Sequence, residues 1–138
     1  MIFINYIFRK LGIISKGNIT KSLSNEELKF QTIFQNIIQL LESEKHYGQA
    51  NSVKFIQELL ELKKIDEFIK EINSVNMWGG SGAVWEVYFV NEKSERKFQR
   101  EIINLIDLME RTKIIVPNIN PIRKFFKKEL LKDLEASS

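Results

Sequence analysis

Apolar residues recur every three or four positions along most of this 138-residue chain, and this spacing limits the possible folds more than any other feature. It is the repeat of an amphipathic α-helix, whose apolar stripe must be covered by another element. From residue 24 onward the repeat predicts five helices, which short connections would make antiparallel neighbours. We therefore expect a mainly α fold, a single-domain bundle of about five helices over residues 1–138.

Capping residues and helix breakers set the expected boundaries of the first two helices. Ser24 and Glu27 form a capping-box pattern, so the first helix is predicted to begin at Ser24. Gly48 is predicted to separate it from the second helix, over about residues 50–63.

Three further helices are expected in the second half of the chain. Asp66 is predicted to cap a short third helix, and a fourth, the most regular, is predicted from about Ser94. Val116-Pro117 breaks the pattern, because the residue before a proline avoids the α region. Asn120-Pro121 then provides an N-cap and a first helical residue for the fifth helix.

The first 23 residues differ from this helical body, which we expect over residues 24–135. Residues 1–8 are mostly apolar and are followed by Arg9-Lys10. A secretory signal has its positive charge before the apolar stretch, and eight residues are too few to cross a bilayer. A docked helix, a strand and a weak interfacial anchor all remain open for this segment.

The distribution of charge says more about partners than the net charge of +3 does. Residues 1–23 contain four basic residues and no acid, residues 121–138 have a net charge of +2, and the middle of the chain is slightly acidic. Basic residues spread in this way usually form a solvated face, so we expect no contact with nucleic acid or membranes. The absence of cysteine favours a cytoplasmic protein.

One segment departs from helical composition: three of the six glycines lie at residues 79–82, between the two tryptophans, Trp78 and Trp85. Residues 83–90 are then rich in β-branched and aromatic side chains, which favours a short strand or a hairpin near these residues. A strand needs a second strand to pair with, and residues 2–8 are the other segment of similar composition. The alternatives are that residues 83–90 begin a helix, or that they form an edge strand that pairs with another protein. Alternation would put Trp85 and Phe89 on one side and Glu86 and Tyr88 on the other.

Two interpretations of the glycines are open. Their backbone N–H groups could cradle an anion, as in phosphate-binding loops, but no lysine follows as it does in those loops. A tight turn that lets two aromatic side chains pack beside the backbone is the interpretation we favour.

The same segment resembles a known sequence pattern. Gly79-Gly80-Ser81-Gly82, with Glu86 in the acidic position and Ala83 in place of a small polar residue, is similar to the Gly-Gly-x-Gly core of small uncharacterised bacterial domains. The likeness extends over roughly residues 30–112 and is specific at residues 78–86. Domains of this kind often resemble immunity proteins, which are encoded beside bacterial toxins; the resemblance implies such a role.

Catalytic chemistry is difficult to assemble from the remaining residues. His46 is the only histidine and there is no cysteine, so a Cys-His pair or a site with several histidines is excluded. His46 lies at an expected helix end, where capping explains it. Scattered carboxylates such as Asp107 are best explained as surface charge. We expect no enzymatic activity, no cofactor and no metal.

The sequence therefore predicts a protein-binding module. Its most concrete form is an immunity protein that binds and neutralises a bacterial toxin encoded by an adjacent gene. A basic toxin would require a local acidic patch on this chain. The alternative is a small-molecule or phosphate-binding protein that uses residues 79–82. The residues predicted to contact the partner come from the glycine-containing segment: Trp78, Gly79, Gly80, Trp85, Glu86 and Tyr88.

Overall fold

The computed structural model describes residues 16–115 and 119–137, and within them it contains helices and no strand. Five helices have eight residues or more, which confirms the predicted mainly α bundle. The elements in chain order are α2 (Lys16–Ser43), α3 (Tyr47–Glu61), α4 (Ile65–Ile72), the single turn α5 (Val75–Trp78), the 3-10 turn η1 (Val84–Glu86), α6 (Glu92–Arg111) and α7 (Asn120–Ser137).

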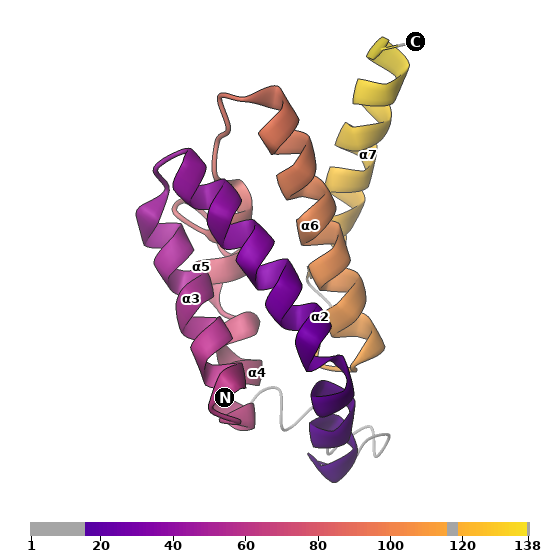
Figure 1. Ribbon diagram of the computed structural model, residues 1–138. Helices are drawn as coiled ribbons and strands as arrows, with labels where there is room; N and C mark the ends of the chain where they lie inside the picture. The colour runs from indigo at the N-terminus through magenta and orange to yellow at the C-terminus, as the bar shows by residue number, and fades with distance from the viewer. Residues whose placement is uncertain (1–15, 116–118, 138) are drawn as a thin grey trace.

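The 28-residue helix α2 is the centre of the arrangement (Figure 1). It packs against α3 on one side and α6 on the other, and α7 packs on α6. The short elements α4, α5 and η1 complete the layer around α3. Each helix therefore covers the apolar stripe of a neighbour, as the helical period requires.

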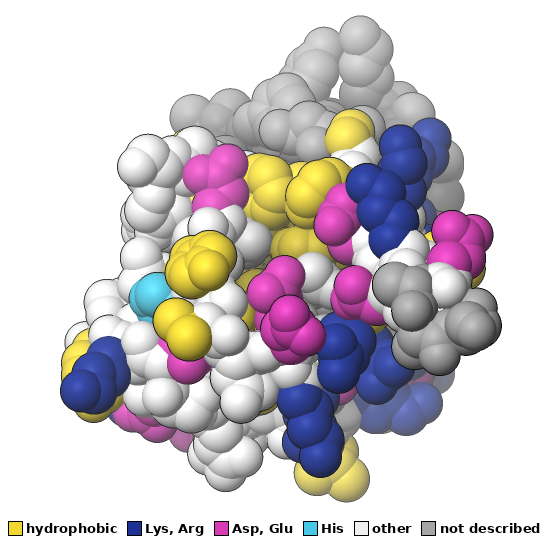
Figure 2. Space-filling view, turned by 90° about the horizontal axis from the view of Figure 1, so that it is seen from above, with side chains coloured by type: hydrophobic (Ala, Val, Ile, Leu, Met, Phe, Trp, Pro, Cys, Tyr) yellow, Lys and Arg dark blue, Asp and Glu magenta, His cyan; other side chains and the backbone are white. Residues whose placement is uncertain are grey.

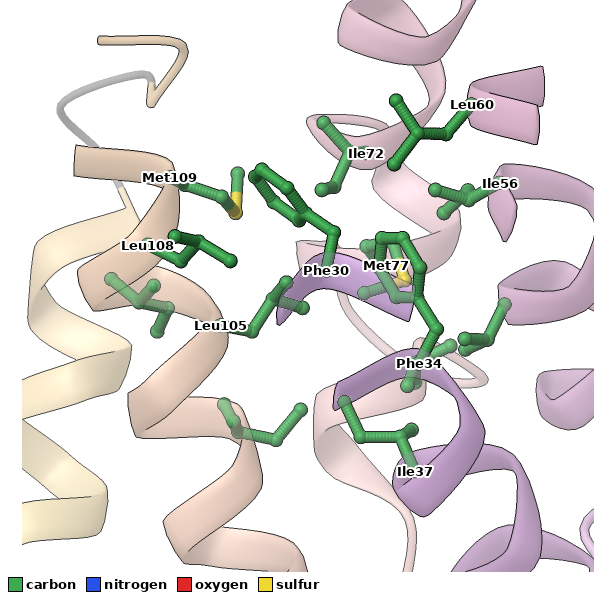
Figure 3. Packing of buried hydrophobic residues seen from close by; sticks show 14 of the residues in the cluster. Phe30, Phe34, Ile37, Ile56, Leu60, Ile72, Met77, Leu105, Leu108 and Met109 are labelled. Atoms are coloured by element: carbon green, nitrogen blue, oxygen red, sulfur yellow. The ribbon is translucent and has the colours of Figure 1, made fainter. Parts of the chain in front are cut away.

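Aromatic side chains join α2 to α4 in the middle of the core. Phe30 and Phe34 of α2 and Phe68 of α4 are fully buried, with ring centroids 5.6 to 6.2 Å apart. Phe30 points between Met109 of α6 and Ile72 of α4 (Figure 3). One buried cluster thus connects helices that are far apart in the sequence.

Helix α2 begins earlier than predicted, because the apolar stripe continues upstream of Ser24. Ile19 and Leu23 are buried and extend that stripe by two turns, so the helix already runs from Lys16. Ser24 is exposed in the helix interior and caps nothing. Glu27 forms an ion pair with Lys63, at the end of α3.

The boundary between α2 and α3 was also predicted wrongly, since Gly48 lies in the first turn of α3. The chain turns instead at Lys45, which has a left-handed φ of 63°. The N–H of His46 donates to the Leu41 carbonyl and the N–H of Lys45 to that of Glu42, closing a Schellman motif. Lys63 and Lys113 end α3 and α6 in the same way.

The later boundaries are close to those expected, with one exception. Asp66 lies in the first turn of α4 and is not its cap. Helix α6 starts two residues before Ser94, whose N–H is accepted by the N-cap Asn91 at 2.8 Å. Helix α7 begins at Asn120, one residue before Pro121, which was predicted to be its first helical residue.

Two predictions fall on residues that the structure does not describe: the form of residues 2–8, and the break at Val116-Pro117. Among the described helices, none is both long enough and apolar enough to cross a membrane. The predicted surface carboxylate Asp107 pairs with Arg123 at 2.8 Å, and Arg123 also bonds Glu110 at 2.5 Å, which fastens the start of α7 to α6.

Candidate functional site

The segment from residue 79 to residue 91 crosses from α5 to α6 without forming the predicted strand or hairpin. Val84–Glu86 forms a 3-10 turn, and the residues that follow are extended but have no strand beside them in the described part of the chain. The prediction failed because β-propensity describes a side chain's fit to a sheet, and no sheet is present here to receive it.

Side chains from the α2–α3 corner, residues 44–49, replace the missing strand partner. His46 Nε2 donates to the Tyr88 carbonyl at 2.7 Å, and Gln49 Nε2 donates to the Gly82 carbonyl at 3.1 Å. The Glu44 carboxylate accepts from the backbone N–H of Val90 and, at 3.3 Å, from that of Asn91. His46 therefore holds this segment and does not cap a helix, since its side chain makes no cap hydrogen bond.

The glycines serve the turn in two distinct ways. A Cβ atom on Gly79 would lie 2.6 Å from the Val75 carbonyl oxygen, so only glycine allows this close approach. Gly82 has φ +89°, a backbone conformation that residues with a side chain rarely adopt. The N–H of Gly79 donates to the Val75 carbonyl, and the N–H of Ala83 donates to the Gly80 carbonyl. These contacts support the tight-turn interpretation; phosphate binding by residues 79–82 remains a prediction.

Both tryptophans are half-buried and hydrogen-bonded within the chain. Trp78 packs on the core and donates its indole N–H to the Ile72 carbonyl at 2.6 Å. Trp85 donates to the Gly79 carbonyl at 2.9 Å. Trp78 thus faces inward, whereas Trp85 also lines a pocket with Glu86.

Tyr88 and Val90 are the exposed large hydrophobic residues of the segment. Their side chains are 76% and 79% exposed, while Phe89 between them is buried against Phe98, with ring centroids 4.8 Å apart. Hydrophobic side chains stand out beside the histidine in Figure 2. Tyr88 and Val90 form what we call the exposed pair; Tyr88 was predicted from the sequence and Val90 was not.

A pocket of about 370 Å³ lies between η1, the start of α6 and α7. We call it the aromatic pocket. Trp85 meets Phe125 and Phe126 edge-on, at centroid distances of 6.3 and 6.1 Å. Its lining consists of apolar and aromatic side chains with acidic and amide groups, namely Trp85, Glu86, Val87, Phe89, Glu95, Phe98, Gln99, Phe125, Phe126 and Glu129. Trp85 and Phe89 both line the pocket, but so does Glu86, which the alternation of a strand would have placed on the other side, because residues 84–86 form a 3-10 turn.

Acidic groups concentrate around the aromatic pocket, although the chain is basic overall. Burial raises the pKa of the Glu95 carboxyl, and the neighbouring carboxylates of Asp133, Glu92 and Glu129 raise it further, against the opposing charge of Arg96. Figure 2 shows apolar side chains lying between acidic ones on this face. The arrangement is a local acidic patch on a basic chain.

The predicted contact residues are therefore divided among three places. Trp85 and Glu86 line the aromatic pocket, Tyr88 belongs to the exposed pair, and Gly80 is exposed in the turn. Gly79 and Trp78 support the turn from inside.

Sequence reasoning missed the residues that other helices bring to the pocket. Phe125 has the spacing of an apolar stripe residue of α7, but it is 49% exposed and lines the pocket. Glu95 and Gln99 carried a weak signal: they lie one turn apart, and Gln99 falls among the apolar residues Phe98 and Ile102 of the helix.

No group of three or more potential metal ligands is found in residues 16–115 and 119–137. No protein-family model, curated protein or solved structure matches this chain.

Proposed function

We propose that this chain is a non-enzymatic protein-binding module that acts as an immunity protein and neutralises a bacterial toxin by direct binding. The observation that carries the proposal is the exposed pair. Tyr88 and Val90 are more than three-quarters exposed, on a segment whose backbone is hydrogen-bonded to the side chains of Glu44, His46 and Gln49. An exposed aromatic side chain on a backbone that is already ordered loses little conformational entropy on binding.

Two further observations support the proposal. The acidic patch around the aromatic pocket suits a basic partner, which the net charge of the whole chain would otherwise repel. The single histidine, the residue on which most catalytic schemes would depend, has its Nε2 bonded to a backbone carbonyl and its ring packed on Phe89.

Co-expression with the product of the adjacent reading frame tests the proposal. The expected result is a stoichiometric complex and rescue of cell growth from that product. The double variant Tyr88→Ala, Val90→Ser should weaken the complex roughly 30-fold or more, as the loss of an interface hot spot does.

Leu28→Ser is the matched control, because Leu28 is 80% exposed on α2, away from the pair. It should leave the affinity unchanged. Absence of both complex and rescue would contradict the immunity role. An unchanged affinity of the double variant would contradict the assignment of the surface.

A further inference from the structure

Gln99 lines the aromatic pocket and has a buried amide oxygen that no described residue satisfies. The residue is 5% exposed, and its Oε1 atom has no hydrogen-bond partner within residues 16–115 and 119–137. Its Nε2 atom donates to Glu95 Oε1 at 3.4 Å. The reverse orientation of the amide would place its oxygen against an oxygen of the ionised Glu95 carboxylate, so the atom left without a partner is the acceptor. A buried acceptor without a donor is costly, which points to a ligand that supplies an N–H or O–H.

The charges around the pocket indicate the sign of the charge that the ligand should carry. The carboxylates of Glu92, Glu129 and Asp133 act on Glu95, and Glu86 lies on the rim. Cations oppose these carboxylates at two points: Arg96 acts on Glu95, and Lys132 pairs with Glu129 at 3.4 Å. The acids outnumber these cations, so the pocket favours a positively charged guest.

The aromatic rings specify its shape. Trp85 meets Phe125 and Phe126 edge-on, and all three rings line the pocket, where they offer contacts for an apolar stem or for a cation. A cation over such a face gains about 0.5–1 kcal/mol at an exposed site, and tryptophan is the strongest of the aromatic residues. About 370 Å³ is room for one small group, at the lower end of the usual range for ligand pockets.

We propose that the aromatic pocket binds an organic cation with an apolar stem, an alkylammonium or guanidinium group, whose N–H donates to Gln99 Oε1 and whose charge faces Glu95 and Glu129. Such a group is carried by an arginine or lysine side chain of a partner and also by a free polyamine. The proposal does not depend on the immunity role, because the isolated chain should bind the free group.

An NMR titration of the full chain tests this directly. N-acetyl-argininamide and spermidine are added separately, with the Trp85 indole N–H and the Gln99 side-chain amide as reporters. Both reporters should shift and saturate in the millimolar range, since one small group supplies an affinity of about 1 mM. Tighter binding of the arginine derivative identifies a partner side chain as the source, and tighter binding of spermidine identifies a free polyamine.

Matched probes and variants make the outcome decisive. The neutral N-acetyl-norleucinamide should produce no saturable shift. Glu95→Gln and Phe125→Leu should each weaken binding roughly three- to fivefold, while Glu58→Gln, an exposed carboxylate of α3, should not. Equal shifts with the neutral probe, or no saturable shift with either cation, would overturn the proposal, whether or not a protein partner is found.

Discussion

At the scale of single residues, Glu95 combines an unfavourable electrostatic position with a place in the aromatic pocket. Burial raises the pKa of its carboxyl in the folded protein, and the carboxylates of Asp133, Glu92 and Glu129 raise it further. Between the pKa of the unfolded chain and this higher value, the folded state binds more protons. Stability from this group is therefore fully present below the unfolded pKa and is lost as pH rises through the folded pKa.

Glu95→Gln should remove this dependence, because glutamine stays neutral. At pH 7 the variant should have a free energy of unfolding about 0.5 kcal/mol above that of the wild type, the usual size of a repulsion between partly exposed charges. Below the unfolded pKa the difference should vanish. Urea unfolding of both proteins across this pH range measures the effect, with Glu58→Gln as control for the loss of one negative charge. A gain of the same size at every pH would argue against the assigned cause.

Residue-level signals explain both the correct and the incorrect predictions of helix ends. The fixed φ of Pro121 favours the first turn of a helix, so the start of α7 could be predicted to within one residue from Asn120-Pro121 alone. The ends of α2, α3 and α6 could not, because Lys45, Lys63 and Lys113 occupy the left-handed region that usually indicates glycine. Gly48, the glycine that was expected to mark such an end, lies within a helix.

At the scale of elements, the 79–91 segment gets its form from a distant part of the chain. Its own sequence predicted a strand, but Glu44, His46 and Gln49 hold it in an extended path beside the α2–α3 corner. These contacts join residues more than 30 positions apart. Local propensity carries no information about such contacts. The aromatic pocket has the same origin, since α6 and α7 contribute Gln99 and Phe125 to a wall that begins at Trp85.

His46→Ala should loosen this segment without unfolding the bundle. Loss of one hydrogen bond to the Tyr88 carbonyl and of the ring contact with Phe89 should cost about 1 kcal/mol. Hydrogen exchange followed by mass spectrometry should show faster exchange in peptides that cover residues 84–91, while peptides from α2 change little. Ser52→Ala is a suitable control, because Ser52 bonds only within α3. Exchange at the wild-type rate in residues 84–91 would show that His46 is dispensable there.

At the scale of the whole molecule, the buried cluster includes side chains from α2 to α7. This joining of all the helices followed from periodicity alone, because each apolar stripe predicted that another element would cover it. The periodicity could not predict which helices pack their apolar stripes against each other. The T-shaped contact between Phe30 and Phe68, 5.6 Å between centroids, depends on a helix pairing that no spacing encodes.

Because the helices share one core, we expect a destabilising substitution in one helix to lower the stability of the whole molecule. Phe34→Leu should lower the free energy of unfolding by about 1–2 kcal/mol, because Phe34 is fully buried against Phe30 and Phe68. Far-UV circular dichroism follows all helices, whereas tryptophan fluorescence follows only Trp78 and Trp85. In one cooperative unit both signals have the same urea midpoint, and Phe34→Leu shifts them equally. Leu28→Ala, in the same helix but exposed, should shift neither. Separate midpoints would show that the segment carrying the exposed pair unfolds independently, and its hydrogen bonds to residues 44–49 would then be too weak to preorder it for a partner.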